Sequence, residues 1–251
     1  MKRLHAPLSA VLEDVGWLRA VPEELRASVE AEITEAWYRS GCVVAHRGEP
    51  AHSWIGVVDG LVKVSSVART GRTVFFSAIP EGCWVGEGSM IKQEARRYDI
   101  VAMRDTRVLH LPASTFRWLQ QSCLDFNKIL VERLNARLSQ ALSMVETDRM
   151  GDPLARIART IAALFDPVLY PRRQLGLQLS QAEISELVGL SRSTISIGLR
   201  LLQNEGLLST HYGKIVVHRI AELRRYEGEE GRRSLRRAPK AARVPPTGDK
   251  V

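Results

Sequence analysis

The sequence predicts an α+β protein with an N-terminal jelly-roll-like β-roll, one long helix and a C-terminal winged helix-turn-helix. Three observations predict this class. Short β-rich runs separated by turn residues fill the region 43–111. Apolar residues then recur every three or four positions through 127–145. Two capped helix signatures joined by a glycine turn follow at 180–202. The chain has 251 residues, which suits about two domains.

The first forty residues have a helical pattern. Apolar residues recur at helical spacing from Leu8 to Leu18, and Pro22 followed by two glutamates is a typical helix start. Because polar residues interrupt this pattern, no continuous apolar core of a signal peptide follows the basic N-terminus. No stretch approaches the ~20 apolar residues that cross a bilayer. We therefore expect a cytoplasmic protein with no membrane partner.

The period changes at Val43, where short β-rich runs begin. Turn residues such as Gly48, Gly60 and Gly71 separate them. The runs are 43–45, 54–58, 61–64, 73–76, 98–102 and 107–111. Several short strands at this spacing predict a barrel or jelly roll. Helical sequence resumes after Pro112.

A long helix is expected over about 113–148. Its apolar residues form a seam along one face. The seam consists of Leu130, Leu134, Leu138, Ala141 and Val145. It packs either on the β-roll of its own chain or on the same helix of a second copy, and we favour the second copy. Asp152 and Pro153 then begin a new helix, which sets the domains at 1–148 and 149–226. The polar, basic tail 227–251 has the composition of a disordered segment.

The region 180–202 predicts a helix-turn-helix. Ser180 and Glu183 form a capping box, Gly189 suits the left-handed residue that ends a helix, and Ser191 caps the helix that begins at Arg192. Polar side chains gather on one face of this second helix, and a strand-turn-strand pattern over 209–217 predicts a wing. An ordinary amphipathic hairpin is the alternative, but three independent signals favour DNA binding. A homodimer on the seam would then present paired helices to half-sites one DNA turn apart.

The net charge of +8 and the sequence pI near 9.7 suit an anionic partner such as DNA, although basicity alone also suits a membrane surface or a solubilising tail. Cys42, Cys83 and Cys123 are widely spaced and odd in number. This spacing favours reduced thiols over a disulfide framework or a metal site.

From Val43 to Val217 the chain resembles the Crp/Fnr family of bacterial transcription regulators. The resemblance rests on the run 79–87, the run 102–109, and the helix-turn-helix sequences 180–184 and 188–195. It implies a palindromic double-stranded DNA operator, RNA polymerase as a partner, and base contacts from the start of the second helix. The implied DNA-binding residues are Ser180, Gln181, Arg192, Ser193, Thr194, Ser196, Ile197, Arg200 and Lys214.

The resemblance also implies an effector pocket at Gly86, Glu87, Arg96 and Arg97. Family members that bind cyclic AMP have a glycine-glutamate pair for the ribose and an arginine followed by a hydroxyl residue for the phosphate. Here Arg97 replaces the hydroxyl residue, and Tyr98 adds bulk. A cyclic nucleotide is therefore a candidate effector, but we expect cyclic AMP to bind poorly. In the alternative, Glu87 and Arg96 pair with each other in a vestigial pocket.

Other functions find less support in the residues. No cysteine precedes Cys42, so the clustered N-terminal ligands of an iron–sulfur cluster are missing, and no histidine pattern indicates haem. We assign no metal and no catalytic residue. A cupin-like enzyme would need a His-x-His pair, which the sequence lacks. An effector-binding module without DNA binding is the closer alternative.

Overall fold

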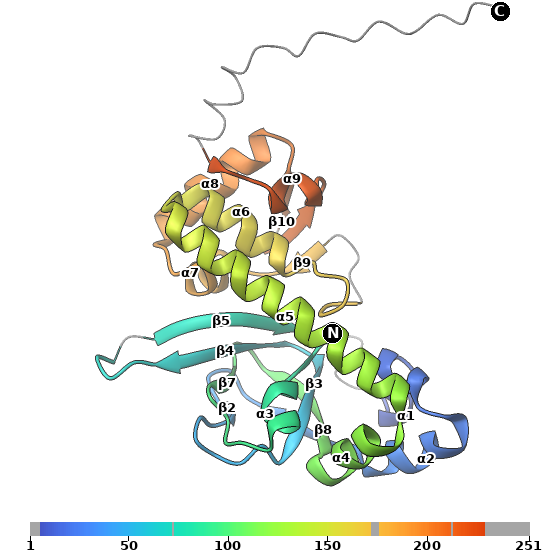
Figure 1. Cartoon of the computed structure of the whole chain (residues 1–251). Helices are drawn as coiled ribbons and strands as arrows, with labels where there is room; N and C mark the ends of the chain where they lie inside the picture. Colours follow the sequence, from blue (N-terminus) through green and yellow to red (C-terminus); the bar gives the residue numbers. More distant parts are fainter. Residues whose placement is uncertain (1–5, 72, 172–175, 212, 229–251) are drawn as a thin grey trace, which may run out of the picture.

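The structure is a computed structural model that describes residues 6–71, 73–171, 176–211 and 213–228 (Figure 1). The described helical segments are α1 (Leu8–Leu12), η1 (Gly16–Ala20), α2 (Glu23–Glu32), α3 (Glu87–Lys92), α4 (Ala113–Ser122), α5 (Leu124–Met150), α6 (Pro153–Ala163), α7 (Gln181–Val188), α8 (Arg192–Asn204) and α9 (Ile220–Arg224). Almost all of the predicted tail 227–251 lies outside the described residues.

The described strands are β1 (Thr34–Tyr38), β2 (Val43–Ala45), β3 (Ser53–Asp59), β4 (Leu61–Val67), β5 (Thr73–Pro80), β6 (Trp84–Val85), β7 (Asp99–Ala102), β8 (Thr106–Pro112), β9 (Gly176–Gln178), β10 (Leu208–His211) and β11 (Lys214–Val217). Two antiparallel four-stranded sheets, in the orders β1-β8-β3-β6 and β2-β7-β4-β5, make up the N-terminal domain. This architecture confirms the predicted α+β class with an N-terminal β-roll.

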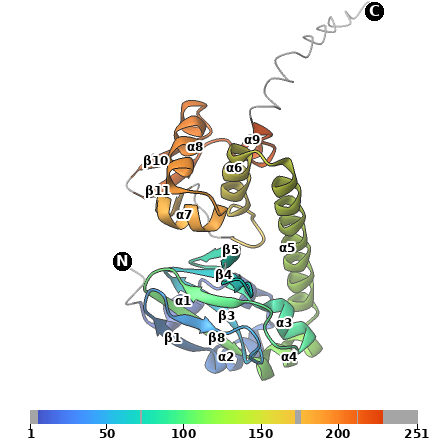
Figure 2. The same cartoon turned by 90° about the vertical axis from the view of Figure 1, so that its left-hand side faces the viewer.

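Two sequence-based boundaries were wrong. The first forty residues are not all helical, because Thr34–Tyr38 forms the edge strand β1, paired with β8. The helix expected over about 113–148 is two helices, α4 and α5, because Cys123 has the extended angles φ −121° and ψ 105°. α5 then continues to Met150 and runs along one side of the molecule from α4 to the C-terminal domain (Figure 2).

An aromatic cluster fixes α5 on the β-roll. Trp54 is fully buried, and its ring centroid lies 4.7 Å from that of Trp84 and 5.3 Å from that of Trp17. Phe126, in the first turn of α5, packs edge-on against Trp17 at 5.5 Å. Buried aromatic rings contribute large apolar areas. The start of α5 is therefore anchored in the core of its own domain.

The C-terminal domain consists of α6 to α9 and the small sheet β10-β11-β9. Asp152 caps α6 by accepting hydrogen bonds from the backbone amides of Leu154 and Ala155, both at 2.8 Å. α8 crosses close to α6 at Gly198, where an added Cβ would collide with the Ile157 side chain. A side chain at position 198 would therefore require the end of the Ile157 side chain to move.

The two domains contact each other through α7 and the β4-β5 hairpin (Figures 1 and 2). Lys63 Nζ lies 2.9 Å from Glu186 Oε2, and Arg104 Nη2 lies 3.0 Å from Glu183 Oε1. Arg104 also donates to the Gln178 carbonyl oxygen at 2.8 Å. The first helix of the helix-turn-helix therefore rests on the β-roll, and α8 lies beyond it.

Candidate functional site

The helix-turn-helix has the local geometry that its sequence predicts. The Glu183 amide donates to Ser180 Oγ at 3.2 Å, and Glu183 Oε2 accepts from the Ser180 amide at 2.7 Å, which completes the capping box. Gly189 is left-handed with φ 70°, and Ser191 Oγ accepts from the Thr194 amide at 3.2 Å. The capping box, the turn and the start of α8 at Arg192 are confirmed.

α8 has one buried and one exposed face. Ile195, Leu199 and Leu202 are buried against the domain core. The opposite face carries the residues implied by the family resemblance: Arg192, Ser193, Ile197 and Arg200 are exposed, and Thr194 and Ser196 are partly exposed. This face therefore offers guanidinium groups, hydroxyl groups and one apolar side chain to an outside partner.

The other implied DNA-binding residues come from outside α8. Ser180 and Gln181 are exposed at the start of α7, and Lys214 is exposed at the start of β11. Gln203 joins α8 to the wing because its Oε1 accepts from the Thr210 amide at 3.3 Å and from the Thr210 hydroxyl at 3.1 Å. The end of α8 is thus hydrogen-bonded to the wing. The exposed Arg192, Arg200 and Lys214, together with the N-terminus of α8, suit phosphate contacts.

The seam on α5 divides into a buried and an exposed part. Leu130 is only 2% exposed because it packs in the core of its own domain, so its assignment to an intermolecular seam was wrong. The remaining seam leaves large apolar side chains in contact with solvent. Leu134 is 38%, Leu138 57% and Val145 49% exposed. A row of exposed apolar residues at this spacing is typical of a helix that packs on another helix.

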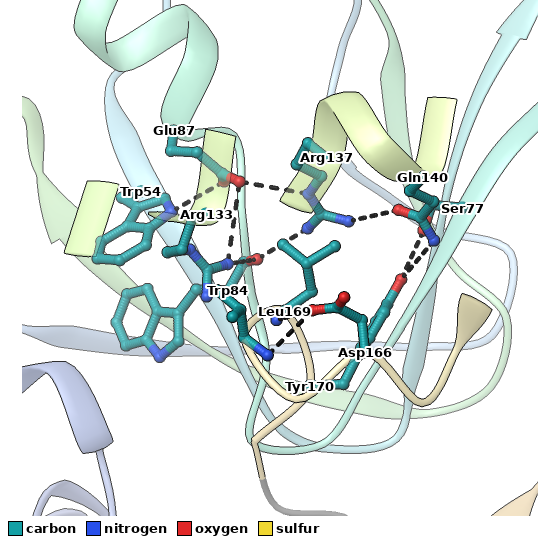
Figure 3. Close-up of polar contacts among 11 residues, drawn as sticks. Trp54, Ser77, Trp84, Glu87, Arg133, Arg137, Gln140, Asp166, Leu169 and Tyr170 are labelled. Atoms are coloured by element: carbon teal, nitrogen blue, oxygen red, sulfur yellow. Dashed lines mark hydrogen bonds and ion pairs between the residues drawn. The ribbon is translucent and has the colours of Figure 1, made fainter. Parts of the chain in front are cut away.

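Glu87 is the buried acid of the predicted effector pocket, and arginines of α5 neutralise it (Figure 3). Its carboxylate lies 3.3 Å from Arg137 Nε and 3.9 Å from Arg133 Nη2, and it accepts a hydrogen bond from Trp54 Nε1 at 3.4 Å. Burial alone raises the pKa of this carboxyl, but the two arginines and the hydrogen bonds outweigh it, so the Glu87 pKa lies below its usual value. Glu87 is therefore an anion with its partners already in place.

Arg96 has partners other than Glu87, which contradicts the alternative in which these two residues pair with each other. Arg96 Nη2 donates to the Ser53 carbonyl oxygen at 2.6 Å. Its Nη1 is buried and has no hydrogen-bond partner among the described residues. This atom would lie 2.6 Å from a Cβ at position 86, and the left-handed φ of 98° also favours glycine there. Gly86 and Arg96 together leave one buried cationic donor available to an anion.

Arg97 lies apart from this cluster. Its Nε is 2.9 Å from Glu94 Oε1, and its side chain is 70% exposed. Tyr98, in contrast, is partly buried within reach of the charges of Glu87, Arg96 and Arg137. Burial raises the pKa of the Tyr98 phenol, so it stays neutral. The structure thus brings together Gly86, Glu87 and Arg96, with Tyr98 beside them and Arg97 outside.

Sequence reasoning missed the residues that connect this pocket to the C-terminal domain. Tyr170 comes from the segment after α6, and its hydroxyl lies 2.9 Å from Ser77 Oγ on β5 and 3.2 Å from Gln140 Nε2 on α5 (Figure 3). The Arg137 guanidinium lies 6.0 Å from the centroid of the Tyr170 ring. Arg137 therefore contacts both the buried acid of one domain and an aromatic ring of the other.

All three cysteines are free thiols. Within the described ranges, no three His, Cys, Asp or Glu side chains are grouped so that they could hold a metal ion. No helix of the described residues is long and apolar enough to cross a membrane.

Comparisons with known proteins assign both domains. The profile of the cyclic nucleotide-binding domain matches residues 35–123, and that of the Crp-like helix-turn-helix domain matches 155–226. The cAMP-activated global transcriptional regulator CRP of Escherichia coli is 27% identical over 207 residues, which cover 75% of this chain and 96% of the relative. The transcriptional regulator LdrP of Thermus thermophilus is 28% identical over 186 residues, 72% of this chain and 91% of LdrP. Among solved structures, FixK2 from Bradyrhizobium japonicum has the same fold, with TM-score 0.61, 22% identity and coverage of 77% of this chain and 96% of that chain.

Proposed function

Because the chain belongs to the Crp/Fnr family of transcription regulators, we propose that it binds a palindromic operator as a homodimer in the cytoplasm and contacts RNA polymerase there. It carries out no catalysis. The observation that carries this proposal is the exposed polar face of α8, bordered by the wing and held on the same molecule as an exposed apolar seam. The polar face of α8 would bind DNA, and the apolar seam would join two chains into a dimer.

We assign base contacts to the exposed start of α8. Arg192 would bind guanine O6 and N7 with its forked donors. Ser193, Ser196 and Ile197 would face the neighbouring bases, and the apolar Ile197 side chain, 54% exposed, suits a thymine methyl group. The remaining implied residues position the protein through phosphates. They are Ser180, Gln181, Thr194, Arg200 and Lys214.

The dimer is proposed to form along the exposed part of the α5 seam. Leu134, Leu138 and Val145 follow the a and d spacing of a coiled coil. A two-fold axis along α5 would place the two copies of α8 symmetrically, as a palindromic operator requires.

The effector of the Glu87 pocket is proposed to be an anion other than cyclic AMP. The supporting observation is the buried, unpartnered Nη1 of Arg96 beside Gly86. A ribose would have to displace Arg137 or Trp54 from the Glu87 carboxylate, and the bulk of Tyr98 lies beside the same cluster. The proposed effector contacts are Gly86, Glu87 and Arg96; the anionic group would face Arg96 beside Gly86, Glu87 would face a hydroxyl group of the effector, and Arg97 would act only after leaving Glu94.

Operator selection tests the DNA-binding proposal. Duplexes selected from a random pool with the full chain are measured by fluorescence anisotropy beside scrambled duplexes. Arg192→Ala should lose about 1–3 kcal/mol on the selected duplex and relax the preference at one base pair. Arg225→Ala, an exposed arginine at the end of α9, is the matched control and should change little. Equal losses on both duplexes for Arg192→Ala would assign a phosphate contact instead.

A further inference from the structure

A cavity of about 380 Å³ lies between the two domains, apart from the Glu87 pocket. Its wall consists of β5, the C-terminal half of α5, one face of α6 and the end of α7. None of Gly86, Glu87 and Arg96 lines it. Concave sites of this size that are mostly apolar and carry a few polar groups typically bind compact small molecules.

The wall combines apolar surface with a small number of charges. Phe76, Met144 and Leu187 contribute apolar side chains from β5, α5 and α7. Glu186 also lines the cavity, but Lys63 neutralises it at 2.9 Å. The Arg159 guanidinium is likewise engaged, with the Tyr226 carbonyl oxygen at 2.9 Å and Glu146 at 3.0 Å.

Arg156 is the cation of this wall whose partner is held most loosely. Its Nη2 lies 3.4 Å from Asp148 Oδ1, and the two side chains are 38% and 59% exposed. Such exposed ion pairs contribute little to stability, so Asp148 can be separated from Arg156 and solvated by water at small cost in free energy. The same Nη2 lies 3.4 Å from the position of a Cβ at Gly189, which places the guanidinium against the turn between α7 and α8.

We propose that this interdomain cavity binds a compact, largely apolar organic anion. Its charged group would replace Asp148 as the partner of the Arg156 guanidinium. The apolar walls take the body of the molecule, and the planar fork of an arginine suits a carboxylate or sulfonate. A bound molecule would contact β5 of one domain and the helix-turn-helix of the other. Ala141 and Val145 belong to both the seam and this wall, so a partner helix would close one rim of the cavity.

The test titrates the full chain, without DNA, with 8-anilinonaphthalene-1-sulfonate, which joins apolar rings to one anionic group. We expect saturable, blue-shifted fluorescence with one probe per chain. Arg156→Gln should weaken binding by about tenfold, the effect of one lost charge-assisted hydrogen bond. Arg219→Gln is the matched control because it is also loosely paired, at 3.5 Å from Glu222, and lies outside the cavity. Its affinity should equal that of the unmodified chain.

A second variant fills the space. Ala163→Trp should abolish probe binding while circular dichroism melting stays unchanged. If this variant does not fold, the comparison of Arg156→Gln with Arg219→Gln tests the proposal. Equal binding by Arg156→Gln and the unmodified chain, or several probes per chain, would overturn the proposal. Binding seen only in a monomeric Leu138→Glu variant would also overturn it, since a partner chain would then occupy the cavity. Because no DNA is present, none of these results bears on operator recognition.

Discussion

Replacing Arg137 with methionine should destabilise the N-terminal domain and loosen its contact with the C-terminal domain. The variant keeps an unbranched apolar stem but leaves the buried Glu87 carboxylate with Arg133 at 3.9 Å, Trp54 Nε1 at 3.4 Å and a backbone hydrogen bond. Removing one partner of a buried ion pair costs about 3–5 kcal/mol. Because Arg133 remains, we expect the lower end, about 3 kcal/mol.

Urea unfolding at pH 7, followed by tryptophan fluorescence, measures this loss because Trp54 and Trp84 lie beside the pair. The double variant Glu87→Gln with Arg137→Met removes both charges and should recover part of the loss, and the cycle then gives their coupling energy. Arg97→Met is the control, since Arg97 lies in an exposed pair with Glu94. A loss below about 1 kcal/mol without coupling to Glu87 would refute the role assigned to Arg137.

The same pair predicts a pH dependence. The Glu87 pKa is lowered in the folded protein, so ionised Glu87 stabilises the fold above the pKa of the unfolded chain. This contribution is lost as the pH falls through the lowered pKa. Removal of Arg137 raises the folded-state Glu87 pKa towards or above its unfolded value, so Arg137→Met should lose less stability on acidification than the unmodified chain, and the difference in stability between the two proteins should shrink as the pH falls. Identical acid profiles for the two proteins would contradict this mechanism.

Three other outcomes are expected. Leu138→Glu would place an unpaired charge in the dimer interface, so it should sediment as a monomer while Ser139→Glu, on an exposed polar position of the same helix, stays dimeric; a dimeric Leu138→Glu would move the interface elsewhere. Calorimetry should show no micromolar binding of cyclic AMP, and tight binding that is lost in Arg96→Ala would overturn our reading of the pocket. Lys63→Glu and Glu186→Lys should each weaken the contact between domains, and the double reversal should restore it, with a coupling of about 0.2–1 kcal/mol in urea unfolding; no restoration would show that this ion pair does not hold the domains.

The helix-turn-helix could be predicted from sequence because its signals are local. Ser180 and Glu183 are three residues apart, and the Gly189 turn and the Ser191 cap follow in the same short stretch. Side chains this close in sequence satisfy backbone groups of their own helix whatever the rest of the fold does. The β-rich runs were similarly readable from their turn residues.

Features that depend on distant contacts could not be predicted. β1 exists because β8, about seventy residues away, pairs with it, and its mixed burial leaves no clear alternation. The Glu87–Arg137 pair joins residues separated by 50 positions in sequence. The Tyr170 hydroxyl bonds to Ser77 on β5, which is 93 positions away. Leu130 fits the seam by spacing, but the aromatic cluster around Trp54 holds that end of α5 against its own domain. Periodicity gives a face of a helix but not its partner.

Stoichiometry and spacing on the selected operator test the central proposal most directly. Sedimentation of the full chain with a labelled duplex, combined with hydroxyl-radical footprinting, gives both quantities in one set of samples. Two symmetric α8 helices should yield two chains per duplex and two protected half-sites about 34–36 Å apart. One chain per duplex, or a single protected half-site at saturating protein, would contradict a dimeric regulator that reads DNA through α8.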